Sequence, residues 1–274
     1  MHALPFVFSL LAAAALTPLV LKRLASAGVT RENYRGRQLP VPLGVVIVPA
    51  ALFALVPLTL LDRFGHVDVY PESFTLAMLF IPGVALLGFI DDVLSGSGRG
   101  WRGHGKDVLS GGLSTGVIKA VGTLGLALFV ARFLSVSDGE FLLAVALLVL
   151  ATNTANLLDL RPGRAVKAFV LLGIGLTLST QVTEAPAALG IFAAPVLIAG
   201  FFDLREKAML GDAGSNAIGG MAGLWMVLSL DTNGQLIALV VLLALNIFGE
   251  FRSISAVIEK APGLRHLDSI GRTK

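Results

Sequence analysis

Cysteine is absent from this chain, and charged residues are scarce. The lack of cysteine excludes a disulfide framework, thiolate catalysis and a zinc site built on cysteine. Only 14% of the residues are charged and 55% are hydrophobic, whereas a soluble domain carries roughly 25% charged residues. Together with a mean hydropathy of +0.83, this composition predicts an integral membrane protein.

Nine apolar runs along the chain have about the length of a membrane span, roughly 17–25 residues. They cover residues 3–21, 41–61, 74–90, 115–134, 141–158, 165–182, 186–202, 215–230 and 235–251. Glycine is abundant, as is typical where helices pack closely in lipid. We therefore predict an all-α polytopic membrane bundle of about nine transmembrane helices, with residues 1–274 forming a single domain.

The distribution of lysine and arginine predicts the orientation of this bundle. With the amino terminus outside, 19 of the 21 basic residues fall on the inner side, and Arg63 and Arg132 are the exceptions. Cytoplasmic loops carry an excess of Lys and Arg. We therefore expect an outer amino terminus, a cytoplasmic carboxyl terminus and residence in the plasma membrane.

Polar residues gather where predicted spans end on this inner side. Two adjacent acids, Asp91 and Asp92, end the third span. The other members are Lys119 near the start of the fourth span, Asn153, Asn156 and Asp159 at the end of the fifth, and Gly211, Asp212, Gly214 and Ser215 at the start of the eighth. Ionisable groups at a membrane boundary are costly and are therefore functional candidates.

Each motif taken alone has a structural explanation beside the functional one. Asn153 and Asn156 could form hydrogen bonds between helices, and Asp212 or Ser215 could simply cap a helix. Asp91 and Asp92 could be solvated boundary acids. Taken together, separated acids beside a glycine-rich helix start, which can bind phosphate through backbone amides, favour a magnesium–diphosphate site.

The same motifs resemble the polyprenyl-phosphate N-acetylhexosamine-1-phosphate transferase superfamily, which includes the phospho-N-acetylmuramoyl-pentapeptide and GlcNAc-1-phosphate transferases. The matching blocks are Gly88-Phe89-Ile90-Asp91-Asp92 with Ser114 and Lys119, Asn153-Thr154-Ala155-Asn156-Leu157-Leu158-Asp159, and Lys207 to Ser215 running into Gly219. A weaker block, Arg37 to Gly44, is similar to the first cytoplasmic loop of the family. The order of the blocks agrees over nearly the whole chain.

This resemblance implies a reaction and a role for each matching residue. A UDP-N-acetylhexosamine would donate its sugar-1-phosphate to a polyprenyl phosphate of the undecaprenyl type, with release of UMP and with Mg²⁺, or Mn²⁺, as cofactor. Asp212 matches a metal ligand, and the pair Asp91 and Asp92 matches acids near the lipid phosphate or the metal. The implied substrate contacts are Asn153, Asn156, Asp159, Lys119, Gly211, Gly214 and Ser215. A homodimer is compatible with this reading, and nothing indicates nucleic acid as a partner.

Two departures from the family pattern leave alternatives open. Arg161 and Arg164 stand where the second block usually carries another acid, and they either clamp the donor diphosphate or only satisfy the positive-inside rule. The histidine-rich motif of the pentapeptide transferases is reduced to His266, which makes that subgroup the second choice. A non-catalytic polyprenyl-phosphate-binding protein or a transporter is the alternative of another class, although acids at the boundary argue against transport.

Overall fold

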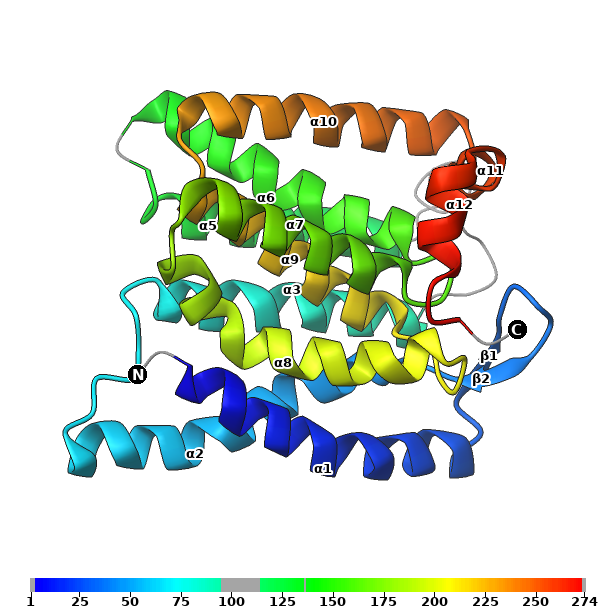
Figure 1. Cartoon of the computed structure of the whole chain (residues 1–274), viewed down its shortest axis with the longest axis horizontal. Coiled ribbons are helices and arrows are strands. Elements are labelled where there is room, and N and C mark those ends of the chain that lie inside the picture. The colour runs from blue at the N-terminus through cyan, green and yellow to red at the C-terminus, as the bar shows by residue number, and fades with distance from the viewer. Residues whose placement is uncertain (1–2, 95–113, 136, 273–274) are drawn as a thin grey trace.

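Long helices lie side by side in alternating directions and form a single bundle (Figure 1). The computed structural model describes residues 3–94, 114–135 and 137–272, and the basic loop with Arg99, Arg102 and Lys106 lies outside them. The helices are α1 (Leu4–Ser26), η1 (Leu43–Val46), α2 (Ile47–Gly65), α3 (Phe74–Leu94), α5 (Thr115–Ala131), α6 (Asp138–Leu158), α7 (Arg164–Thr180), α8 (Glu184–Leu204), α9 (Gly211–Ser229), α10 (Thr232–Phe251), α11 (Ile254–Lys260) and α12 (Pro262–Ser269). The strands are β1 (Thr30–Glu32) and β2 (Gln38–Pro40).

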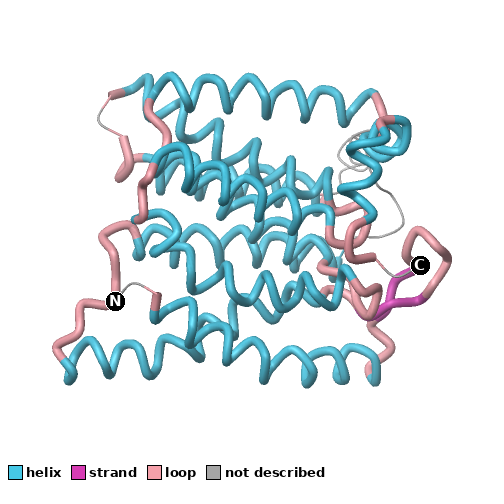
Figure 2. The backbone as a smooth tube through the Cα atoms, in the orientation of Figure 1, coloured by secondary structure: helices cyan, strands magenta, loops and turns pink. Residues whose placement is uncertain are grey.

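The predicted helical architecture is confirmed, with one small addition. Each apolar run coincides largely with one of the long helices. Among the described residues, six helices are long and apolar enough to cross a membrane, so the predicted number of nine spans is not confirmed. These six are α1, η1 with α2, α3, α6, α8 and α10. The sequence did not predict the antiparallel hairpin of β1 and β2, which projects from the end of the bundle that also carries the carboxyl terminus (Figure 2).

Short-range hydrogen bonds fix the start of several helices. Ser137 and Glu140 form a capping box at the start of α6: the Glu140 N–H donates to Ser137 Oγ, and the Ser137 N–H donates to Glu140 Oε2. The side chain of Asp231 accepts from the Gly234 N–H at 2.8 Å and caps α10. Ser114 caps α5 in the same way. Such caps satisfy amides that have no partner inside the helix.

Helix α9 lies at the centre of the bundle, where it packs against α3, α6, α7 and α8. Its small residues allow this enclosure. At Gly219 a Cβ would collide with the backbone of Thr152 on α6, so the two helices approach as closely as their main chains permit. The amino-terminal end of α9, which carries Asp212, is thereby placed beside the ends of α3 and α6.

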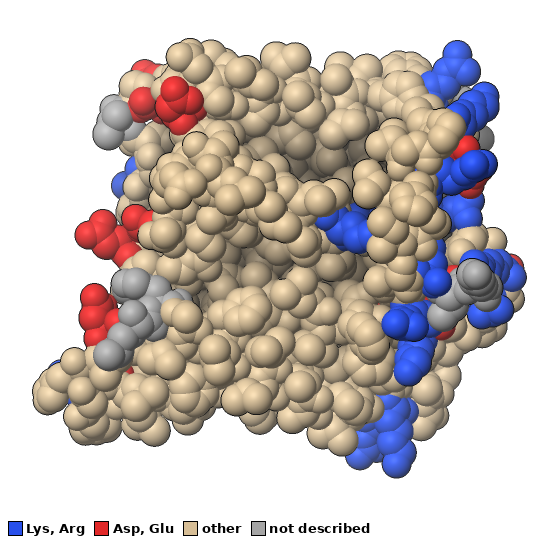
Figure 3. Space-filling view, viewed as in Figure 1, with Lys and Arg blue, Asp and Glu red and all other residues tan. Residues whose placement is uncertain are grey.

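The outer surface of the bundle is apolar between two polar ends. On α10, for example, the side chains of Ile237 and Val240 are about two-thirds exposed, at 67% and 66%. Figure 3 shows Lys and Arg gathered at the end that holds the hairpin, α11 and α12, and Asp and Glu mostly at the opposite end. An apolar belt of this kind, on helices that satisfy their own backbone hydrogen bonds, is typical of a protein embedded in a membrane.

Candidate active site

Three of the predicted site residues meet at the basic end of the bundle. Lys119 on α5 donates through Nζ to Asp212 Oδ2 at 2.8 Å, and the same Nζ lies 3.6 Å from Asp91 Oδ2 on α3. Both carboxylates therefore approach the same ammonium group. We call Asp91, Lys119 and Asp212 the acid–lysine cluster. Its members are far apart in the sequence and come from three helices.

The acid–lysine cluster is enclosed but keeps one open side. The side chains of Asp91 and Lys119 are 13% and 16% exposed, whereas the Asp212 side chain is 36% exposed. Partial burial strengthens the attraction between the lysine and the two carboxylates, because the local dielectric constant is lower than in water. Asp212 is therefore the most accessible member of the cluster.

A glycine on α3 permits this arrangement. Gly88 lies one turn before Asp91 and Asp92, and a Cβ at this position would collide with the carbonyl of Asp212. Gly44 faces the backbone of Gly214 in the same manner. Both contacts are between main chains, so no rearrangement of side chains relieves them. The start of α9 is therefore locked between α3 and the segment that follows β2.

The Asp92 carboxylate turns away from the acid–lysine cluster. Asp92 Oδ2 accepts from the Ala213 N–H at 2.9 Å, and Asp92 Oδ1 lies 3.6 Å from the Arg31 guanidinium on β1. The Asp92 side chain is only 1% exposed. The sequence interpretation grouped Asp92 with Asp91 and Asp212 as metal ligands. In the structure Asp92 instead binds Ala213 at the start of α9 and Arg31 on the hairpin.

Protein atoms occupy the space around the glycine-rich start of α9. Gly211 has a φ of +73°, and a Cβ there would lie 2.6 Å from Pro42 and 2.7 Å from Asp92 Oδ2. Ser215 donates to the side-chain oxygen of Asn156. The sequence interpretation assigned Gly211, Gly214 and Ser215 to substrate phosphate. In the structure the Asp92 carboxylate binds the Ala213 amide at this helix start, and the small residues allow close packing.

The two asparagines of α6 hold neighbouring helices together. Asn156 donates to Asn216 Oδ1 at 2.7 Å, and Asn216 donates in turn to the Val84 carbonyl on α3. Asn153 donates to Asn246 on α10 at 2.5 Å. These bonds are the interhelical alternative that the sequence left open. Asn156 is linked to the Asp212 carbonyl through Ser215, whose hydroxyl contacts both. Asn153 bonds to α10 instead.

Asp159 lies at the end of α6, near the acids but without a salt bridge among the described residues. Burial raises the pKa of Asp159 well above its ordinary range, and the charges of Asp203 and then Asp212 add to this effect. Lys119 acts in the opposite direction. The charges of Asp212 and Lys119 therefore act on Asp159, although Asp159 forms no salt bridge with Lys119 in the described part of the chain.

The arginines of the 161–164 turn bind the carboxyl-terminal segment. Arg164 forms a bidentate pair with Asp268 at 2.9 and 3.0 Å and donates to Ser255 at 2.9 Å. Arg161 donates to Glu259 at 2.7 Å. A bidentate arginine, as proposed for clamping the donor diphosphate, is therefore present, but it binds a carboxylate of the protein itself. His266 is exposed on α12 and does not join the cluster.

Two buried acids were missed by the sequence interpretation. Asp203, at the end of α8, accepts from the Gly163 N–H at 2.6 Å. Glu206 accepts from Asn33 and Tyr34 and pairs with Arg35 on the hairpin, which fixes the hairpin to the bundle. Both acids stand in a polar stretch between two spans, where acids are expected at the surface. Neither has a local pattern that predicts burial.

Asp268 is expected to keep α12 bound to Arg164 over most of the pH range. Burial acts to raise its pKa, but hydrogen bonds and charge from Arg164 and Arg272 outweigh this and lower it. A lowered folded-state pKa stabilises the folded state above the unfolded value of about 4. That stabilisation is lost as the pH falls through the folded pKa.

A spin label at Gly263→Cys tests this docking, because an added side chain there meets nothing within 4 Å. We expect unchanged label mobility from pH 7 to 5 and a rise below about pH 4. In an Asp268→Asn background the label should be mobile throughout. A label at Gly139→Cys, at the other end of the bundle, is the control. Equal mobility with and without Asp268 would contradict the docking role.

The acids present fit a cation held by two carboxylates rather than three. Among the described residues, no group of three or more His, Asp or Glu side chains is arranged to hold a metal ion. Magnesium is usually held by one or two carboxylates together with substrate phosphates. Asp91 and Asp212 supply such a pair, whereas Asp92 is bound to the start of α9.

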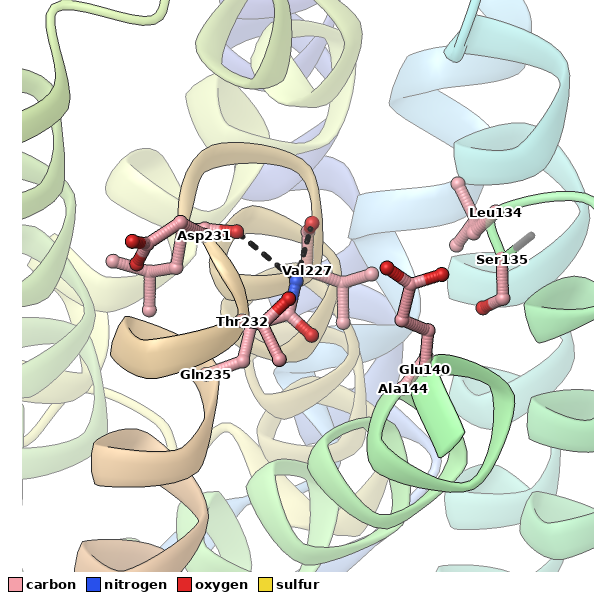
Figure 4. Close-up of a pocket in the computed structure, with 9 residues that line it drawn as sticks. Leu134, Ser135, Glu140, Ala144, Val227, Asp231, Thr232 and Gln235 are labelled. Carbon is pink, nitrogen blue, oxygen red and sulfur yellow. Dashed lines mark hydrogen bonds between the residues drawn. The ribbon is translucent and has the colours of Figure 1, made fainter. Parts of the chain in front are cut away.

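A separate pocket of about 240 Å³ opens at the acidic end of the bundle, far from the acid–lysine cluster (Figure 4). Its polar residues form hydrogen bonds at the ends of helices. Gln235 donates to the carbonyls of Val227 and Leu230, while Asp231 and Glu140 belong to the caps of α10 and α6. These bonds explain the polar lining by local structure.

Comparison with models of known protein families gives no match, and comparison with curated protein sequences gives no significant match either.

Proposed function

We propose that this protein is a membrane-embedded sugar-1-phosphate transferase that moves N-acetylhexosamine-1-phosphate from a UDP-sugar to polyprenyl phosphate. The observation that carries the proposal is the acid–lysine cluster. Asp91, Lys119 and Asp212 occupy the places that the resemblance assigns to the reaction. They meet at one end of an apolar bundle, where a soluble donor and a lipid acceptor have access to the same site.

The proposed reaction is a direct displacement at phosphorus. An oxygen of the lipid phosphate attacks the β-phosphorus of the UDP-sugar, the bond to the bridging oxygen breaks, and UMP leaves with that oxygen. Asp91 and Asp212 would hold Mg²⁺, which when bound supplies charge neutralisation for the diphosphate. Lys119 neutralises and orients a phosphate oxygen. Phosphoryl transfer depends mainly on positioning and charge, which these residues supply.

Purified protein in detergent tests the function directly. It is incubated with Mg²⁺, undecaprenyl phosphate and a panel of UDP-sugars that includes UDP-N-acetylglucosamine and UDP-N-acetylmuramoyl-pentapeptide. We expect UMP release that requires both the lipid and the metal. Release with the pentapeptide donor alone would select the muramoyl subgroup. No UMP with any donor, from protein that is folded, would reject the transferase.

A non-catalytic polyprenyl-phosphate-binding protein is the second candidate. The observation that favours it is the engagement of Arg161 and Arg164 with Glu259 and Asp268, which leaves the predicted diphosphate clamp occupied by the protein itself. This candidate predicts saturable binding of undecaprenyl phosphate with no turnover of any UDP-sugar. The same assay, run alongside a lipid-binding measurement, separates the two functions.

The proposed orientation puts the acid–lysine cluster on the cytoplasmic face of the plasma membrane. The basic end of the bundle, with the hairpin and α12, would face inward by the positive-inside rule (Figure 3). A single cysteine at Gly139, at the acidic end, should react with an impermeant thiol reagent added to intact cells. A cysteine at Gly263 should react only after the cells are opened. The reverse pattern would contradict the orientation.

A further inference from the structure

We infer that Asp92 is a positioning residue that holds Asp212 in the acid–lysine cluster through the backbone beside it. This inference rests on the proposed function for its kinetic part only. Asp92 stands near the end of α3 and reaches the start of α9. Its salt bridge is to Arg31 rather than to Lys119.

The backbone on both sides of Asp212 contacts the Asp92 carboxylate. Asp92 Oδ2 accepts from the Ala213 N–H at 2.9 Å. The same oxygen faces Gly211, where a Cβ would lie only 2.7 Å from it. The first amides of a helix have no partner within it, so an outside acceptor fixes where the helix begins.

The carbonyls of the same segment are held from the other side. The N–H groups of Leu43 and Gly44 donate to the carbonyls of Met209 and Leu210 at 2.8 and 2.9 Å. With the Ala213 amide bound by Asp92, the backbone is held on both sides of Asp212. A residue held in this way keeps its side chain directed at Lys119 without rearrangement.

Asp92 is deeply buried, which separates it from the more exposed Asp212. The Asp92 side chain is 1% exposed, against 36% for the Asp212 side chain. Arg31 compensates the charge of Asp92 at 3.6 Å. A buried carboxylate that already accepts backbone hydrogen bonds is poorly placed to reach a ligand. Its contribution to the reaction is therefore the position of its neighbour.

Asparagine and alanine variants distinguish positioning from direct contact. Asparagine caps a helix about as well as aspartate does, whereas alanine removes the acceptor. We expect Asp92→Asn to retain activity within about tenfold of the wild type, and Asp92→Ala to lose about 100-fold. The Mg²⁺ requirement should be unchanged in Asp92→Asn. Asp91→Asn and Asp91→Ala are the matched control, in which asparagine should not rescue.

Hydrogen exchange gives a reading that does not depend on activity. The amides of residues 211–213 should exchange at least about tenfold faster in Asp92→Ala than in the wild type, and near the wild-type rate in Asp92→Asn. If the wild type has no transferase activity, the proposed function fails and the exchange rates alone test the positioning. If Asp92→Ala does not fold, Asp92→Asn decides. Unchanged exchange in Asp92→Ala, or loss of activity and a raised Mg²⁺ requirement in Asp92→Asn, would overturn the inference.

Discussion

Asp212→Asn is expected to abolish UMP release, with a loss of about 1000-fold or more, while the protein remains folded in detergent. Asp212 is the most exposed acid of the acid–lysine cluster and the direct partner of Lys119 at 2.8 Å. Asparagine keeps the shape of the side chain but removes the charge that a cation needs. Lys119 would also lose its closest anion, so its Nζ would no longer be held between α3 and α9.

The control for this substitution is Asp68→Asn, an exposed acid in the connection between α2 and α3 at the opposite end of the bundle. It removes the same charge without touching the acid–lysine cluster and should leave UMP release unchanged. The measurement is the rate of release as a function of Mg²⁺ concentration for both variants. If Asp212→Asn turned over at a rate close to that of Asp68→Asn, Asp212 would have no place in the chemistry.

The sequence predicts the helices well because each is encoded by its own apolar run. It also predicts correctly that Asp91, Lys119 and Asp212 lie together, since the boundary of a membrane restricts where polar groups can be. The predicted number of nine spans is not confirmed, because six helices in the described part of the chain are long and apolar enough to cross a membrane. Helix α9 is not one of them; it is rich in small and polar residues and is enclosed by protein rather than by lipid.

The direction of individual side chains is what sequence reasoning could not supply. Asp91 and Asp92 are adjacent, but successive residues on a helix point about 100° apart. One therefore faces Lys119 and the other faces the backbone of α9. Similarly, the partner of Arg164 is Asp268, 104 residues further along the chain. Such pairs depend on how distant elements pack, which a local pattern does not encode.

Gly88→Ala is expected to separate α3 from α9 and to disrupt the acid–lysine cluster. The added Cβ would collide with the Asp212 carbonyl, and its closest contacts are all backbone atoms, so the helices themselves must move. Overpacking of this kind costs about 1–3 kcal/mol and often more where no side chain can yield. We expect a fall of several degrees in Tm. The rate of UMP release should fall further than stability alone explains, because Asp91 lies one turn beyond the collision.

A graded series of glycine substitutions makes this test specific. Gly125→Ala on α5 adds a Cβ that meets nothing within 4 Å, and it should be neutral or slightly stabilising because alanine favours the helix. Gly122→Ala meets only the side chain of Leu87, at 2.8 Å, which can change rotamer, so an intermediate effect is expected. Activity is measured well below the Tm of each variant, so that unfolding does not contribute. A Gly88→Ala protein that matched Gly125→Ala in both Tm and turnover would show that the contact between α3 and α9 does not set the geometry of the site.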